Sequence, residues 1–161
     1  MTPNVRILRT VALLFIFVLV LPAIAVAQND EENWPSLSYL RNDYRDSTVV
    51  ARVQVDKAEV VNTIGGYEDW HLVARIVESF KGKFRKDATI DFYHGAEKGF
   101  QQKTFLGDKL VFLHRNFVEK EKRWVLAVIE NSTLPYTGDR GQKLRIIRRQ
   151  ARSKAMRRRK A

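Results

Sequence analysis

The sequence of 161 residues contains no cysteine. Disulfides, thiolate metal sites, lipid attachment through a cysteine and cysteine nucleophiles are therefore all excluded. Small exported domains often depend on disulfides, so a domain of this length without them must be held together by packing alone.

Catalytic motifs are absent as well. The chain has no Gly-x-Ser-x-Gly nucleophile motif and no glycine-rich loop that could hold a phosphate. Asp87 and Asp91 bracket one expected strand, and Glu119 and Glu121 alternate with lysines, as in a solvated hairpin tip. We therefore expect a protein that is not an enzyme and has no cofactor.

The three histidines, His71, His94 and His114, fall on three different expected strands. Three imidazoles brought together in a barrel could hold zinc, but the spacings match no known ligand pattern. We interpret them as ordinary strand histidines and expect no metal. A histidine–metal enzyme is the remote alternative.

Only one apolar run is long, and it lies at the amino terminus. Residues 11–20 are almost wholly apolar, follow two arginines and no acid, and precede the small-x-small pattern of residues 25–27. This order is typical of a secretory signal peptide, here residues 1–27. The mature chain is then expected to be secreted or periplasmic. The 17 residues from 11 to 27 are at the low end of what spans a bilayer, so a membrane anchor is the alternative.

Acidic residues are missing from the carboxyl-terminal segment. Residues 140–161 carry 11 Lys and Arg and no acid, whereas residues 28–139 carry 16 Lys and Arg against 18 Asp and Glu. The basic excess of the mature chain therefore lies in one segment. Leu144, Ile147 and Ala151 fall at helical spacing, which predicts a helix unless repulsion among the arginines leaves the segment disordered.

A segment of this kind predicts attachment to an anionic partner. That partner is expected to be an anionic surface or polymer, such as lipid headgroups, cell-wall polymer or polysaccharide, or another exported protein. Export makes nucleic acid an unlikely partner in the living cell. A solvated tail that only aids solubility is the alternative. The expected anion-binding residues are Arg145, Arg148, Arg149, Arg152, Arg157, Arg158 and Arg159.

The remaining residues show the alternation of β-strands after one short helix. The helix is expected over 36–44, and the strands over 48–61, 69–79, 88–93, 109–115 and 123–130. The alternation loses its phase near Ala58, which predicts a bulge. The aromatic residues expected in the core are Trp70, Phe80, Phe92, Phe112 and Trp124.

These elements predict an all-β fold, a small five-stranded OB-like Greek-key barrel with a short N-terminal helix and a basic C-terminal helical or disordered tail. Closure into a barrel leaves no exposed sheet edge. The expected divisions are a signal peptide (1–27), a leader with the short helix (28–46), the barrel (47–132), and a linker with the basic tail (133–161).

Two stretches carry a resemblance to a known family. One joins the apolar strand over 49–55 to the stretch over 70–83, whose strand ends in Phe-Lys-Gly. The other is the run over 104–113, which contains Gly-x-x-Leu-Val-Phe. Their order resembles the OB-fold module of tissue inhibitors of metalloproteinases and the related netrin-like domains. The resemblance implies the scaffold and, as an alternative function, a protein-binding, protease-inhibitor-like domain. The zinc-chelating amino-terminal cysteine of those inhibitors has no counterpart here, so their inhibitory mechanism does not transfer.

Overall fold

The computed structural model describes residues 35–119 and 122–158. The chain divides into two compact units, residues 1–36 and 37–161, and the helices and strands described below belong to the second. The expected signal peptide lies outside the described residues. Among the helices of the described part, none is long and apolar enough to cross a membrane.

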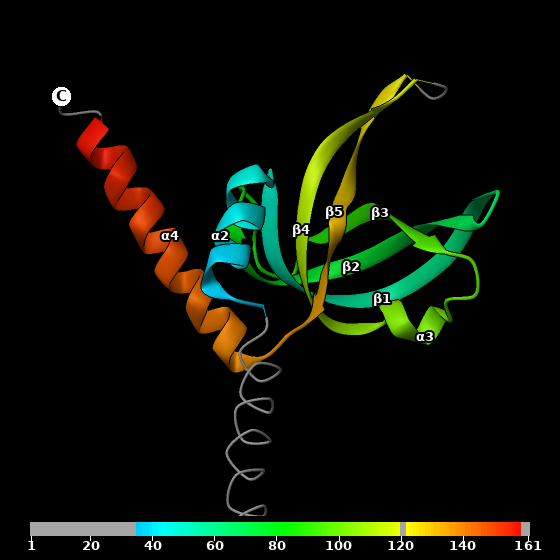
Figure 1. The fold of residues 1–161 in the computed structure, drawn as a ribbon, viewed down its shortest axis with the longest axis horizontal. Coiled ribbons are helices and arrows are strands. Elements are labelled where there is room, and N and C mark those ends of the chain that lie inside the picture. Colours follow the sequence, from blue (N-terminus) through cyan, green and yellow to red (C-terminus); the bar gives the residue numbers. More distant parts are fainter. Residues whose placement is uncertain (1–34, 120–121, 159–161) are drawn as a thin grey trace, which may run out of the picture. The chain divides into compact units, whose positions relative to one another are not determined.

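The described part of the second unit consists of five strands and three helices (Figure 1). The expected short helix and all five expected strands are present, most of them longer than expected. The expected polar connection between the third and fourth strands also contains a short helix. In chain order the elements are α2 (Leu37–Asp46), β1 (Val49–Ile64), β2 (Tyr67–Lys81), β3 (Thr89–Glu97), α3 (Gln102–Phe105), β4 (Gly107–Val118), β5 (Arg123–Pro135) and α4 (Gly138–Arg158).

The strands form a closed ring in the order β1-β2-β3-β5-β4, with β4 paired back onto β1. Neighbouring strands are antiparallel except β3 and β5, which run parallel and share one residue pair, Tyr93 with Ala127. The ring therefore has one short junction, and an opening lies on each side of it.

β1 shows how the sequence pattern produces the ring. Val53 and Val55 point into the ring interior and are fully buried or nearly so. A register shift between Val55 and Lys57 then turns the strand, so that Ala58 resumes the inward position. The bulge expected near Ala58 is confirmed, and it lets one long strand pair with both β2 and β4.

Two apolar clusters lie on the two faces of this ring. The inner cluster fills the ring and includes Leu72, Ile76 and Phe92. The outer cluster lies where α2 and α4, which are side by side in Figure 1, cover strands β1, β2 and β4. Its members are Leu40, Tyr44, Val50, Phe80, Leu110, Phe112, Leu134, Leu144 and Ile147. Each large apolar side chain buried in this way contributes about 1.5–3 kcal/mol, so both helices are part of the folded unit.

One of the expected core aromatics is not in the core. Trp124 is 65% exposed, and its ring packs against that of Phe117, with ring centroids 5.2 Å apart. The two residues are paired near the tip of the β4–β5 hairpin, which extends past the ring in Figure 1. The other four expected aromatics are buried, Phe80 and Phe112 in the outer cluster.

The segment that joins the ring to α4 is closely packed. The Arg140 backbone N–H donates to Thr137 Oγ1, which caps the helix start. A Cβ at Gly141 would collide with the Tyr136 hydroxyl, so a larger residue there would require the Tyr136 side chain to move. The expected boundary between barrel and tail, after residue 132, falls within β5, and the expected tail forms a helix whose first half is docked on the ring.

Candidate functional site

The first half of α4 is held against β2 by two of the expected anion-binding arginines. Arg145 forms a bidentate pair with Glu78, with nitrogen–oxygen distances of 3.0 and 2.7 Å. Arg148 donates to the Ser79 carbonyl oxygen at 3.2 Å. Together with the buried Leu144, these contacts fix the direction of the helix.

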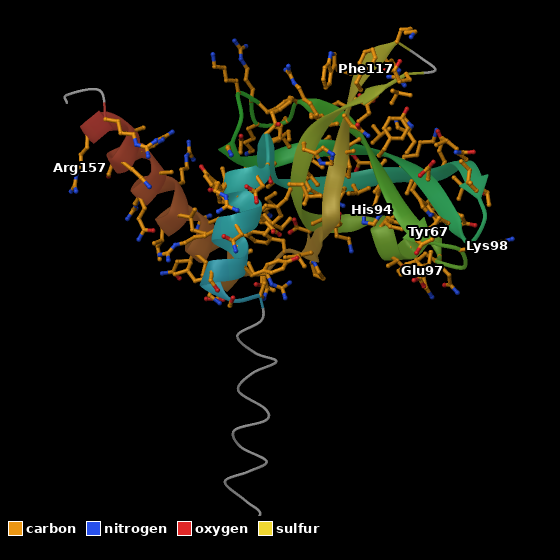
Figure 2. The ribbon with its side chains drawn as sticks, turned by 45° about the horizontal axis from the view of Figure 1, so that its top comes forward. Tyr67, His94, Glu97, Lys98, Phe117 and Arg157 are labelled. Carbon is orange, nitrogen blue, oxygen red and sulfur yellow. The ribbon has the colours of Figure 1, made fainter. Side chains whose placement is uncertain are left out.

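The charged side chains of the second half of α4, residues 149–158, are exposed to solvent. Arg149, Arg152, Arg157 and Arg158 are exposed, and within the described part of the chain none of them has an ion pair. In Figure 2 the Arg157 side chain points away from the ring. The remaining expected residue, Arg159, lies outside the described residues.

A small hollow lies between α4 and the end of β2. Its volume is about 260 Å³, and among the described residues four arginines and one acid, Glu78, line it. Burial raises the pKa of the nearby Tyr44 hydroxyl, while the positive charges of Arg148 and Arg152 oppose that rise. The hollow is therefore a local concentration of positive charge that a single carboxylate offsets only in part. Its arginines are Arg145, Arg148, Arg149 and Arg152.

His71 lies on the outer face of the ring between two carboxylates. Its Nδ1 is 3.7 Å from Glu59 Oε1, and its Nε2 is 3.5 Å from Asp91 Oδ2. The Tyr93 ring packs beside it at 5.1 Å between centroids. The imidazole therefore has one carboxylate near each of its nitrogens.

His94 lies on the opposite face of the same sheet, paired with the buried Trp70 and edge-on to Phe105 at 5.1 Å. Within the described part of the chain, its Nδ1 has no hydrogen-bond partner. Burial lowers the pKa of His94, an effect that nearby backbone groups partly offset. Burial therefore favours the neutral form of this imidazole.

His94 also lines one of the two openings beside the β3–β5 junction. This opening has a volume of about 640 Å³. Figure 2 shows the Tyr67 and Glu97 side chains beside His94 in this region. Phe100 and Val128 contribute apolar surface. The lining of this opening therefore combines aromatic and apolar surface with polar groups.

The structure does not gather the three histidines. His71 and His94 lie on opposite faces of the sheet, and His114 is on β4, opposite Ala127 of β5. In residues 35–119 and 122–158, no group of three or more His, Asp or Glu side chains is placed to hold a metal ion.

Sequence reasoning missed several residues that the fold makes notable. Glu78 anchors α4, and Lys83 and Arg115 line the second opening of the ring. The alternation of apolar residues along β4 could have indicated one of these residues, Arg115. Leu113 points into the core, so Arg115, two residues later, occupies the same inward phase.

No family model matches the chain, and no curated protein matches it.

Proposed function

We propose that this protein is an exported, non-enzymatic interaction module whose OB-like barrel presents α4 to an anionic surface or polymer. Export is proposed from the pattern of residues 1–27. The OB-like assignment is supported by the five-stranded ring, its strand order and its one short junction, as in a partly open Greek-key barrel.

The observation that carries the proposal is the division of α4 into a docked half and a free, basic half. Residues 149–158 are exposed throughout and contain five Lys and Arg and no acid. The docked half supplies the helix nucleus that an isolated basic peptide lacks, so the arginines are presented on an ordered helix despite their mutual repulsion. A binding surface that is already ordered loses less conformational entropy when it binds.

The lining of the hollow beside α4 supports the same function. Arginine binds carboxylate, sulfate and phosphate groups through a planar pair of N–H donors. Arg149 and Arg152 line the hollow and have no carboxylate partner among the described residues. An anionic headgroup that enters the hollow therefore meets arginines that are free to bind it.

The test is co-sedimentation of the full chain with vesicles that contain phosphatidylglycerol, at low ionic strength. Each basic residue at such a surface contributes about 1 kcal/mol. The R149Q/R152Q/R157Q variant is thus expected to lower the partition coefficient about 100-fold. The matched control is K86Q/K98Q/K103Q, which removes the same charge from exposed positions outside α4.

Two outcomes would contradict the proposal. Equal losses in the two variants would mean that only net charge matters. Binding that persists in R149Q/R152Q/R157Q would mean that α4 is not the contact surface.

A further inference from the structure

The second opening of the ring has a lining unlike that of the first. It lies where the β2–β3 turn faces the base of the β4–β5 hairpin and has a volume of about 550 Å³, within the range of about 300–1,000 Å³ that is usual for ligand pockets. Its apolar part includes Val49, which belongs to the inner cluster of the ring, and Phe84 and Leu126, which pack against that cluster. Lys83, Arg115 and Trp124 are also part of the wall, and no carboxylate of the described residues lines it.

Arg115 occupies a position that the strand pattern assigns to an apolar side chain. It is paired with Leu126 across β4 and β5, and directly opposed residues share a face of the sheet. Two residues earlier on the same face of β4, Leu113 is fully buried in the ring. The inward face of β4 thus changes from leucine to arginine where the ring opens.

The two cations of this opening have no partner among the described residues. Within the described part of the chain, neither Lys83 nor Arg115 has an ion pair or a side-chain hydrogen bond. Two other arginines of the ring are paired, Arg52 with Asp108 at 2.6 Å and Arg75 with Asp56 at 3.0 Å. Two unpaired cations beside an apolar floor form a site for a molecule that has an anionic end and an apolar body.

We propose that this opening binds a small anionic amphiphile, namely a carboxylate carried on an acyl or aryl body. The carboxylate lies between Lys83 and Arg115, where the guanidinium can donate two parallel hydrogen bonds. The body lies against Phe84 and Leu126, with the Trp124 ring as a side wall. This site is separate from α4 and does not depend on the function proposed for that helix.

The experiment titrates decanoate, below its micellar concentration, into the full chain and follows tryptophan fluorescence and heat. Removing both charges in K83Q/R115Q is expected to raise the decanoate Kd at least about tenfold, because charge-assisted hydrogen bonds are lost while the aliphatic stems are kept. The charge-conserving variant K83R/R115K is expected to retain binding within about threefold. In Trp124→Phe the fluorescence change is expected to disappear while the heat remains.

Two controls separate this site from α4 and from non-specific adsorption. R149Q/R152Q removes the same charge from α4 and is expected to leave the decanoate Kd unchanged while it weakens vesicle binding. Decanol has the same chain without the carboxylate, so it is expected to bind more weakly than decanoate and equally to wild type and K83Q/R115Q. The proposal is overturned if decanol binds as tightly as decanoate or if K83Q/R115Q binds decanoate like wild type. It is also overturned if K83Q/R115Q and R149Q/R152Q weaken decanoate binding equally.

Discussion

Replacing Leu144 by alanine tests whether α4 is part of the folded unit. Leu144 is fully buried in the outer cluster, between the ring and the two helices. The substitution removes three carbons, at about 0.8 kcal/mol each, so the transfer free energy alone is about 2.4 kcal/mol. A cavity that does not collapse raises the cost of such substitutions to as much as about 5 kcal/mol. Because α4 packs on the outside of the ring and can move inward, we expect a loss of about 2–3.5 kcal/mol.

The assay is urea unfolding of the full chain, followed by circular dichroism. For a domain of this size the free energy of unfolding falls by about 1.5 kcal/mol per molar urea. A variant that is about 3 kcal/mol less stable therefore unfolds at a midpoint about 2 M lower. Ile146→Ala is the matched control, because Ile146 lies on the same helix but is 41% exposed. It is expected to cost no more than about 1 kcal/mol, since alanine recovers some helix propensity.

The outcome decides between a docked helix and a tail. If the two substitutions shift the midpoint equally, or if Leu144→Ala has no effect, the outer cluster does not stabilise the unit. The helix would then hold its charges without the anchor on which the proposed function depends.

Three further substitutions follow from the fold. In the same urea assay, Trp124→Ala is expected to lower the free energy of unfolding by less than about 1 kcal/mol and Trp70→Ala by about 3–5 kcal/mol. The reason is that the Trp124 side chain is 65% exposed and the Trp70 side chain only 5%. Similar losses would mean that both rings lie in the same environment. A double-mutant cycle of E78Q and R145Q is expected to give a coupling energy of about 0.5–1 kcal/mol that shrinks in 1 M NaCl, since the pair is partly exposed; zero coupling at low salt would contradict the pairing. Burial lowers the pKa of His94 below its ordinary value of 6.5. As the pH falls through 6.5, the imidazole is therefore protonated in the unfolded chain before it is protonated in the folded chain. The free energy of unfolding then falls, by at most about 1.4 kcal/mol per pH unit. In His94→Gln the urea midpoint is expected to depend less on pH between pH 7 and 5. An unchanged pH dependence would rule out His94 as its cause.

The secondary structure could be predicted from the sequence in good part, because it depends on local patterns. Alternation identified all five strands, and the loss of phase near Ala58 identified the bulge in β1. The helical spacing of Leu144 and Ile147 indicated α4, and both residues are buried in the structure. A strand or helix records in its own residues which of its faces is apolar, so these features need no knowledge of distant segments.

The assignment of residues to layers could not be predicted in this way. Val50 and Phe112 fall on the outward phase of their strands, yet they are fully buried because α2 and α4 cover that face. Trp124 falls on the inward phase, yet it is exposed because its hairpin extends past the ring. Alternation distinguishes the two faces of a strand, but only contacts with segments remote in the chain decide what covers each face.

The same division applies to the candidate sites. The sequence by itself determined that the excess of positive charge lies in residues 140–161 and that no cysteine is available to stabilise the fold or to catalyse a reaction. Only the tertiary structure separated Arg145, which docks α4 onto Glu78, from Arg149, which remains free. It alone brought Lys83 and Arg115 to one opening, since the pairing of strands far apart in the chain sets which side chains meet. Charge is a property of each residue, whereas a binding site requires a distance between residues, and that distance is set by the closure of the ring.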